Sequence, residues 1–276
     1  MKVSVITVVY NNVSTISSAI ESVLAQTYRN IEFIIIDGGS TDGTYEQILN
    51  YREHIDVFVS EKDSGIYDAM NKGLSFATGD IISILNSDDI FSSRTIIEQV
   101  VMQFLDSNVD GVFGDLDYVH AQDITRVTRR WVSGDYKHGN FLWGWMPPHP
   151  TFFVRKIVYN RHGYFNTSFK TAADYELMLR LIHVNKIRIK YIPKVLVKMR
   201  AGGVSNSSVR NRFKANIEDR LAWQVNGVKP YFFTLYWKPL RKVTQFLSAR
   251  RLKPEPSELD VVEDFVPAEK TSGLIQ

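Results

Sequence analysis

The chain has 276 residues, of which 44% are hydrophobic, 23% are charged and 12% are aromatic. Its length suits one large domain or a domain with an appendage, and its composition is that of a soluble globular protein. The sequence contains no cysteine, which excludes disulfides and thiolate metal sites and agrees with a cytoplasmic location. No run approaches the roughly 18 apolar residues of a membrane span, and the short apolar run 3–10 is interpreted as a first strand, not a signal peptide.

The net charge of +3 conceals a strong asymmetry along the chain. Residues 186–253 carry 17 Lys and Arg side chains but only two acids, Glu218 and Asp219, which gives this segment a charge of +15. Residues 254–276 have a charge of −5, and residues 1–185 have a charge of −7. A basic, aromatic C-terminal part of this kind indicates anionic partners such as diphosphates, anionic lipid or nucleic acid.

The first 115 residues alternate between apolar runs and helical patterns. Strands are predicted at 3–9, 31–36, 57–59, 81–85 and 111–113, and helices at 12–26, 44–51, 69–77 and 95–105. The near-continuous apolar run 31–36 is typical of a parallel strand covered on both faces. This alternation predicts βαβ units and a mostly parallel sheet.

The pattern changes after residue 115. Residues 115–150 are polar and aromatic, and we expect loops and antiparallel strands there. A helix is predicted at 175–183, a strand at 188–199 and a further helix at 209–225. One side of the strand is expected to carry Ile187, Ile189, Tyr191, Val195, Val197 and Met199, and the apolar face of the last helix Val209, Phe213, Ile217 and Leu221. The acidic, proline-containing stretch 254–276 is predicted to be disordered.

Two acidic turns each close an apolar strand, at residues 37–43 and 86–89. Ligands of α/β sheets bind outside the carboxyl ends of the strands, where carboxylates can hold a base, a ribose or a hard cation. These turns are therefore where a catalytic interpretation of the chain begins.

Several motifs follow one another in a set order: Val-Ile-Thr-Val-Val-Tyr-Asn-Asn at 5–12, Asp-Gly-Gly-Ser-Thr-Asp-Gly-Thr at 37–44, and further blocks at 63–73, 85–89, 173–176 and 201–205. Over about residues 1–225 this arrangement resembles the inverting family-2 glycosyltransferases. The resemblance implies an α/β fold of GT-A type, with a mostly parallel nucleotide-binding sheet flanked by helices, a mixed acceptor-side region and C-terminal helices. It also implies a nucleotide-sugar-binding half at 1–115 and an acceptor-binding and catalytic-base half of the same domain at 116–207. Composition and pattern place basic aromatic helices at 208–253 and a disordered acidic tail at 254–276.

The resemblance assigns the nucleotide-sugar donor to a set of residues near the strand ends. Asp37 is the candidate for the nucleotide base, because a carboxylate accepts a hydrogen bond from the N–H of uracil; the alternative is an ordinary Asp-Gly turn. Lys72 is a candidate for phosphate, although a lone helical lysine is more often solvated. The donor set as a whole is Val8, Tyr10, Asp37, Gly38, Asp63, Tyr67, Asn71, Lys72, Asn86 and Ser87.

Asp88 and Asp89 are the candidate ligands of a divalent cation, Mn²⁺ or Mg²⁺. A cation that bridges the two phosphates stabilises the departing diphosphate. The family often has Asp-x-Asp here, whereas this chain has Asn86 at the first position. The alternative is that the adjacent acids only cap the next segment.

Asp174 is the candidate general base, since inversion in one displacement requires the acceptor hydroxyl to lose its proton as it attacks. The family commonly has Glu-Asp where this chain has Ala173-Asp174, and an N-cap role for Asp174 is the alternative. Trp143, Trp145 and His149 are weaker candidates for the acceptor side, the aromatic rings by stacking on sugars and His149 by reaching the diphosphate or metal. Core packing and a rigid proline turn are their alternatives.

Residues 231–251 combine aromatic and basic side chains, and Pro239 suits the first turn of a helix. This combination favours contact with an anionic inner-membrane surface, which would bring the enzyme to a lipid-linked acceptor. Packing on the same domain or on a twin subunit in a homodimer is the alternative.

The leading hypothesis is thus an inverting glycosyltransferase that moves a sugar from a nucleotide diphosphate, expected to be UDP, to a hydroxyl of a lipid-linked saccharide in bacterial surface polysaccharide synthesis. The blocks at 63–73, 85–89 and 201–205 resemble transferases that build capsule, colanic acid or O-antigen. We expect a cytoplasmic enzyme, peripheral on the inner face of the membrane, that binds no nucleic acid. A non-catalytic sugar-nucleotide or glycan-binding protein on the same fold is the alternative.

Overall fold

The computed structural model describes residues 1–201 and 209–234, with the side chains of the last helix described from residue 217 onward. The strands are β1 (Val3–Val9), β2 (Ile31–Asp37), β3 (Val57–Ser60), β4 (Ile81–Ile84), β5 (Asp89–Phe91), β6 (Gly111–Val119), β7 (Val127–Trp131), β8 (Phe153–Arg155) and β9 (Ile189–Arg200). The α-helices are α1 (Ile16–Leu24), α2 (Thr44–Leu49), α3 (Ile66–Phe76), α4 (Ile96–Phe104), α5 (Lys156–His162), α6 (Ala173–Met178) and α7 (Val209–Val225). Three short 3₁₀ turns, η1 (Arg52–His54), η2 (Asn140–Trp143) and η3 (His149–Thr151), and a π-helical turn η4 (Leu179–Val184) complete the described elements.

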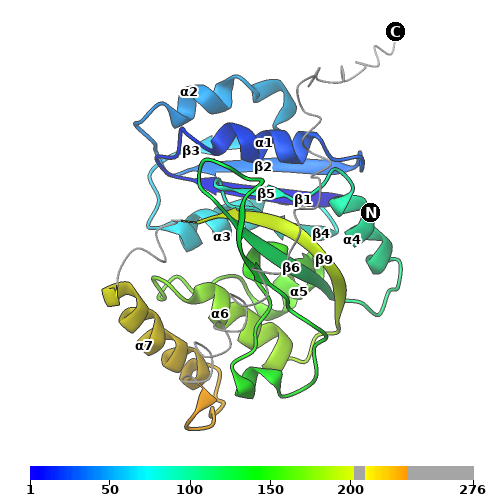
Figure 1. The fold of residues 1–276 in the computed structure, drawn as a ribbon, viewed down its shortest axis with the longest axis vertical. Coiled ribbons are helices and arrows are strands. Elements are labelled where there is room, and N and C mark those ends of the chain that lie inside the picture. Colours follow the sequence, from blue (N-terminus) through cyan, green and yellow to red (C-terminus); the bar gives the residue numbers. More distant parts are fainter. Residues whose placement is uncertain (202–208, 235–276) are drawn as a thin grey trace.

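One twisted sheet runs through the molecule in the order β3-β2-β1-β4-β8-β6-β9-β5, and β7 pairs with β6 (Figure 1). The first four strands of this order are parallel to one another. Beyond them the sheet is mixed, because β8 and β5 run antiparallel to their neighbours while β6 and β9 are parallel. The predicted α/β architecture, with a parallel N-terminal half and a mixed second half, is confirmed.

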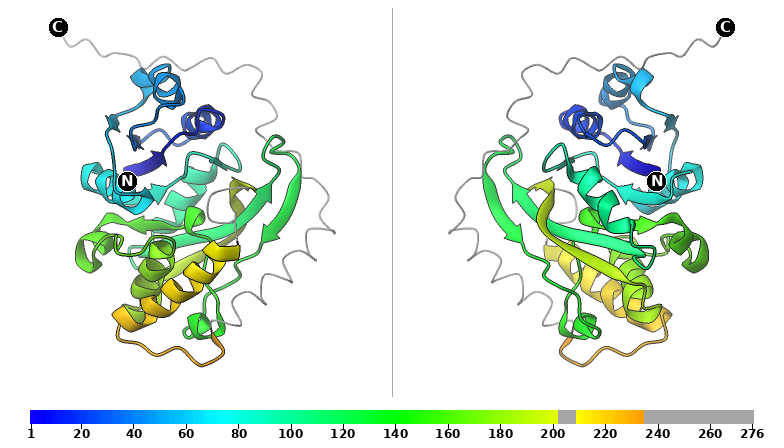
Figure 2. Two further views of the ribbon diagram at one scale, coloured as in Figure 1. Left: turned by 90° about the vertical axis from the view of Figure 1, so that its left-hand side faces the viewer. Right: turned by 90° about the vertical axis from the view of Figure 1, so that its right-hand side faces the viewer.

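Helices cover both faces of the sheet, so the strands are buried on each side. Alternate residues of β1 face opposite ways: Val5 packs in the layer with α1 and α4, and Ile6 packs in the layer with α3 and α6. Figures 1 and 2 show α7 running along α6, at the end of the molecule away from α1 and α2. This double coverage explains the continuous apolar runs seen in the sequence.

Three predicted features of the fold need correction. The helix expected at 12–26 begins only at Ile16, because Asn12 and Thr15 use their polar groups to bond neighbouring loops. The strand expected at 111–113 extends to Val119, since it pairs with both β7 and β9. The helix expected at 175–183 is α6 followed directly by the π-helical turn.

The expected side of β9 is also wrong. Ile187 belongs to the layer with α3 and α6, whereas Val197 belongs to the layer with α1 and α4. The register with β6 shifts between these points, where Phe113 pairs with Tyr191 but Asp115 pairs with Val195. An irregularity of this kind reverses the faces that simple alternation assigns.

Helix α7 confirms its predicted bounds but not its predicted face. Ile217 is 69% exposed and Leu221 is 39% exposed, whereas Ala222 and Trp223 are fully buried. The Trp223 indole donates to the hydroxyl of Tyr175, which fixes the buried side of the helix against α6. The side chains of Val209 and Phe213, and the segments predicted at 235–253 and 254–276, lie outside the described residues.

None of the helices in residues 1–201 and 209–234 combines the length and hydropathy needed to cross a bilayer.

The parallel strands place their carboxyl ends at one edge of the sheet, where Val9 lies beside Asp37 and Asp37 beside Ser60. The loops that leave these strands therefore meet in one region.

Stability at acid pH is expected to depend on Glu32, a nearly buried carboxylate in β2. Its burial alone would raise its pKa, but hydrogen bonds from Lys2, Ser4 and Thr78 outweigh burial and lower the pKa to about 2. A carboxylate with a depressed folded-state pKa stabilises the fold above its unfolded pKa of about 4.3, and this contribution is lost as the pH falls towards 2. Urea unfolding of wild type and Glu32→Gln should therefore differ most at pH 7 and converge by about pH 2. A difference that stays constant over this range would contradict the assignment.

Candidate active site

Hydrogen bonds to the Asp37 carboxylate stabilise the first acidic turn, residues 37–43. The Asp37 carboxylate is fully buried and accepts hydrogen bonds from the backbone N–H and hydroxyl of Ser40 and from the hydroxyl of Ser60. Next to it, Gly38 lies under two side chains, Asp63 from the loop after β3 and Tyr10 from the end of β1. Tyr10 is 64% exposed and Asp63 is half-buried. An aromatic ring and a carboxylate thus both lie against the buried backbone of Gly38.

The second acidic turn, residues 86–89, places several side-chain oxygen atoms between β4 and β5. Asp89 is fully buried and accepts a hydrogen bond from the Asn86 amide through Oδ2. Its Oδ1 and the amide oxygen of Asn86 are buried without a hydrogen-bond partner. Asp88 is half-buried. The Asn12 amide donates a hydrogen bond to the Ser87 hydroxyl, and the Thr15 hydroxyl donates one to the Ser87 carbonyl. Burial raises the pKa of Asp88, and burial together with Asp88 raises that of Asp89.

Arg200 lies beside this acidic turn, at the end of β9. Its guanidinium donates to the backbone carbonyl of Asp88 at 2.9 Å and to the Ser18 hydroxyl at 2.9 Å. Burial lowers the pKa of Arg200, while Asp88 and Asp89 oppose that shift. A cation next to two carboxylates balances part of their charge.

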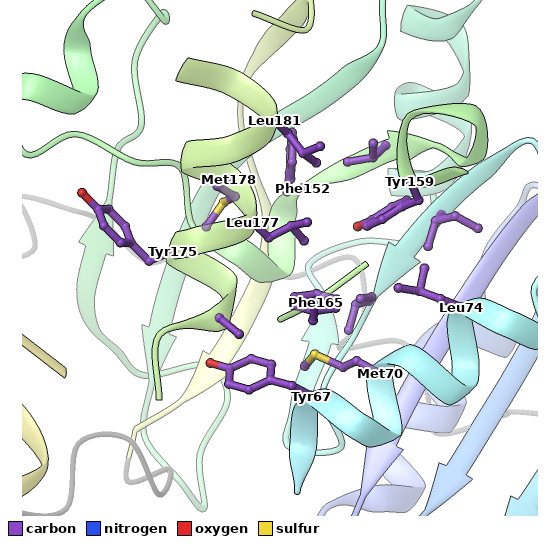
Figure 3. Close-up of a cluster of buried hydrophobic side chains, with 14 of the residues drawn as sticks. Tyr67, Met70, Leu74, Phe152, Tyr159, Phe165, Tyr175, Leu177, Met178 and Leu181 are labelled. Atoms are coloured by element: carbon purple, nitrogen blue, oxygen red, sulfur yellow. The ribbon is translucent and has the colours of Figure 1, made fainter. Parts of the chain in front are cut away.

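Asp174 lies at the N-terminal end of α6, where the hydroxyl of Tyr67 donates to its Oδ1 at 3.3 Å. Tyr67 belongs to α3, and its ring stacks on Phe165 with the ring centres 5.7 Å apart (Figure 3). Asn71, one turn later in α3, bonds both the N–H and the carbonyl of Phe165 at 2.9 Å. Helix α3, which packs on β1 and β2, therefore connects these strands to the segment that carries Asp174.

The pKa of Tyr118 in β6 is raised above its usual value. Burial is the main cause of its raised pKa, Arg129 opposes the shift, and Asp89 and Asp174 each add to it. The Arg129 guanidinium lies 3.6 Å from the centre of the Tyr118 ring. Asp89 pairs with Met199 of β9, and Met199 pairs with Tyr118, so the sheet places Tyr118 two strands away from the second acidic turn.

Glu218 of α7 holds the loop before Asp174. Its carboxylate accepts hydrogen bonds from the backbone N–H groups of Lys170, Thr171 and Ala172, at 2.8 to 3.2 Å, and from the Thr171 hydroxyl. Ala172 is the N-cap of α6 and offers no side-chain cap. The carboxylate from α7 thus bonds the backbone that leads into α6, including the N–H of the N-cap residue itself.

Several predicted site residues are engaged elsewhere. Lys72 forms ion pairs with Glu61 at 2.9 Å and with Asp68 at 3.7 Å, and Val8 is buried in the core. Trp145 is also buried, and its indole donates to the Ser133 carbonyl, which is the core-packing alternative.

The other two acceptor-side candidates have different surroundings. Trp143 is half-exposed and packs on Tyr231 and Phe233. His149 contacts the edge of Phe165, and burial lowers its pKa while Asp174 opposes that shift. Of these two, His149 is the one that lies near the proposed base.

Three residues of this region were not found from the sequence: Tyr118, Arg200 and Glu218. Tyr118 and Arg200 come from strands that only the sheet pairing brings next to the acidic turn, where Tyr118 pairs with Met199. Glu218 is one of only two acids in the basic segment 186–253, and that isolation is the one signal the sequence offered.

Replacing Glu218 should disturb the loop that carries Asp174. Glu218→Ala removes the shared acceptor of three backbone N–H groups, so we expect a loss of about 2 kcal/mol in unfolding free energy. Glu218→Gln keeps one oxygen acceptor and should lose less, whereas the exposed control Glu46→Gln should lose about 0.5 kcal/mol or less. Chemical denaturation measures all three. Equal stability of Glu218→Ala and the control would contradict this role.

Comparison with known proteins gives consistent results. A protein of Mycobacterium tuberculosis named an uncharacterized glycosyltransferase is 32% identical over 188 residues, which cover 64% of this chain and 68% of that protein. A PGL/p-HBAD biosynthesis glycosyltransferase of Mycobacterium bovis is 26% identical over 216 residues, covering 76% and 81% of the two chains.

Solved structures share the fold. TarS of S. aureus in complex with UDP-GlcNAc has a TM-score of 0.64 at 18% identity, covering 96% of this chain and 77% of that chain. In another TarS structure the match covers only 46% of the TarS chain. A mannosyltransferase of Pyrobaculum calidifontis in complex with GDP-Man and Mn²⁺ has a TM-score of 0.62 at 19% identity, covering 93% and 77%. The model of glycosyl transferase family 2 matches residues 4–170, and this chain belongs to that family.

Proposed function

We propose that this protein is an inverting glycosyltransferase that transfers a sugar from a UDP-sugar to a hydroxyl of a lipid-linked saccharide. The observation that carries the proposal is that both acidic groups lie at the carboxyl edge of the parallel strands: the second acidic turn follows β4, and Asp174 is bonded by Tyr67 in the first turn of α3, which follows β3. An acidic turn suited to a diphosphate and a separate carboxylate suited to a hydroxyl thus lie at one edge of the sheet. A single displacement at a sugar carbon needs these two groups on opposite sides of the ring.

The second acidic turn suits a hard divalent cation. The Asp88 carboxylate and the unpartnered oxygens of Asp89 and Asn86 are the type of ligand that Mg²⁺ and Mn²⁺ prefer. Within the described residues no three His, Cys, Asp or Glu side chains form a metal cluster. A cation at this turn would be held by Asp88, Asp89 and Asn86, and water and the donor phosphates would supply its other ligands. When bound, such a cation neutralises the charge that develops on the departing diphosphate. The neighbouring Arg200 adds a fixed positive charge to the same region.

Asp174 is the proposed general base. As the acceptor oxygen forms its bond to the anomeric carbon, Asp174 takes the hydroxyl proton and the bond from that carbon to the diphosphate breaks. The hydrogen bond from Tyr67 orients the carboxylate, and Glu218 fixes the loop that precedes it. The missing second acid at Ala173 is thus partly replaced by supports from α3 and α7.

The donor and acceptor are assigned by analogy. TarS was solved with UDP-GlcNAc, and a 26% identical mycobacterial relative is named for PGL/p-HBAD biosynthesis. These names support a nucleotide sugar as donor. The capsule or O-antigen type of product remains the expectation drawn from the motifs at 63–73, 85–89 and 201–205.

The proposed membrane contact is supported by exposed apolar side chains at the end of the described chain. Phe232 is 89% exposed, Tyr231 is 49% exposed, and both lie within the basic segment 186–253. Ile217, Leu221 and Val225 form an exposed apolar stripe along α7. Aromatic and aliphatic groups beside Lys and Arg suit an anionic membrane surface on the cytoplasmic side.

Two substitutions test the mechanism. With a UDP-sugar, Mn²⁺ and lipid-linked acceptor from membranes, Asp174→Asn should lower the turnover number about 10² to 10⁴-fold, because the proton acceptor is lost. Asp88→Ala should lower UDP release and its response to added Mn²⁺. The exposed control Glu46→Gln should behave as wild type. Wild-type turnover in both site variants would refute the mechanism, and Mn²⁺-dependent UDP binding without turnover on any acceptor would favour the non-catalytic alternative.

Membrane contact is tested with vesicles. Phe232→Ser should weaken binding of the full chain to vesicles containing anionic lipid about tenfold, since insertion of one aromatic side chain contributes roughly 1.5–3 kcal/mol. The matched control Leu105→Ser removes a 63% exposed apolar side chain from the end of α4 and should not change binding. Sedimentation with vesicles at low and high salt measures both, with an oligonucleotide as a competing partner. Equal binding by both variants, or preference for the oligonucleotide, would contradict the proposal.

A further inference from the structure

The carboxylate expected to recognise the nucleotide base is fully used inside the fold. Asp37 is 0% exposed, and both of its oxygens accept hydrogen bonds from Ser40 or Ser60. These bonds tie the end of β2 to β3 and to the turn that follows. Because neither oxygen faces solvent, Asp37 supports the base-binding edge and does not form its surface.

A second carboxylate covers the position beside it. A Cβ atom placed on Gly38 would lie 2.5 Å from Oδ2 of Asp63 and 3.4 Å from the Tyr10 ring. Since carbon atoms do not approach an oxygen to 2.5 Å without a bond, any other residue at position 38 would displace Asp63. The glycine therefore admits the Asp63 carboxylate onto the backbone at the end of β2.

The two oxygens of Asp63 have different surroundings. Oδ1 accepts the backbone N–H of Gly65 at 2.8 Å, which fixes the orientation of the carboxylate. Oδ2, the atom over Gly38, accepts no hydrogen bond from the residues that the structure describes. The ring of Tyr10, 64% exposed, lies against the same Cβ position of this glycine. The free Oδ2 of Asp63 and the exposed ring of Tyr10 thus lie next to each other at Gly38.

We propose that Asp63, and not Asp37, accepts the N3–H of the donor's uracil, with the ring of Tyr10 available for stacking. This inference rests on the proposed function, in which the donor is a UDP-sugar. Uracil presents one N–H on this edge, which matches one free oxygen. Guanine presents two adjacent donors and would leave one unpaired, and the N3 of cytosine is an acceptor that the carboxylate repels. Asp63 is therefore a specificity-determining residue for the base.

Binding of UDP, CDP and N3-methyl-UDP, each with Mn²⁺, tests the contact by isothermal titration calorimetry. Wild type should bind UDP at least tenfold more tightly than N3-methyl-UDP, because the methyl group removes the donor. Asp63→Asn retains an oxygen for the Gly65 N–H but turns an amide N–H towards the base. This variant should lose at least tenfold in affinity for UDP and should gain in affinity for CDP relative to UDP. A purely structural role of Asp63 would lower the affinity for UDP and CDP alike and leave the discrimination against N3-methyl-UDP unchanged.

A glycine variant provides an independent test. Gly38→Ala should fold, since its backbone is not left-handed and the displaced atoms are the end of a flexible side chain. It should weaken UDP binding as much as Asp63→Asn does, and the two changes together should be no worse than either alone. The control Glu46→Ala removes an exposed acid of α2 and should bind UDP as wild type does.

The outcomes separate the inference from the function on which it rests. If wild type binds UDP and turns over a UDP-sugar while Asp63→Asn keeps full discrimination against N3-methyl-UDP, the inference is overturned and the proposed function stands. Additive losses in the double variant would also overturn it. A wild-type protein that binds no uridine nucleotide overturns the proposed donor and the inference together.

Discussion

The clamp between α3 and Phe165 is the contact on which the rest of the site depends. The side-chain amide of Asn71 bonds both backbone groups of Phe165, and the Tyr67 ring stacks on the ring of Phe165. Helix α3 is itself packed on β1 and β2, the strands that end at Val9 and at the first acidic turn. Two regions about a hundred residues apart in sequence, α3 and the loop before α6, are thereby held as one unit. Asn71, which the motif assigned to the donor, contributes through this clamp.

The electrostatics of the second acidic turn follow from its burial. Asp89 lies in a strand and is fully buried, so its carboxylate is held where its charge is costly. The unpartnered oxygens of Asp89 and Asn86 leave this cost unbalanced in the protein alone, and Arg200 compensates only part of it. A site of this kind favours a cation.

Much of the fold was predictable because the parallel strands are covered on both faces. Their apolar runs and the helical patterns between them depend on local sequence alone, so β1 to β4 and the helices between them appear close to where the sequence places them. The mixed half was less predictable. The register shift between β6 and β9 reverses the faces of β9, and α7 buries Trp223 in preference to Ile217 because Tyr175 offers a hydrogen-bond partner. Both outcomes depend on contacts between segments far apart in sequence.

The candidate site, like the fold, was predictable only in part. Motifs located the residues of the two acidic turns and Asp174, but not how the turns are supported. That Asp37 is enclosed by Ser40 and Ser60 while Asp63 reaches over Gly38 depends on how three loops meet. A residue's type is visible in a sequence, whereas the direction of its free oxygen is a property of its neighbours in space.

The contact of Glu218 with three consecutive amides has a consequence for the order in which the protein is made. The chain is synthesised from its N-terminus, and the loop before Asp174 acquires its carboxylate partner only when residue 218 has been added and has left the ribosome. A nascent chain that already contains both acidic turns and Asp174 still lacks this support. In the growing polypeptide, the support for the proposed base is thus completed last.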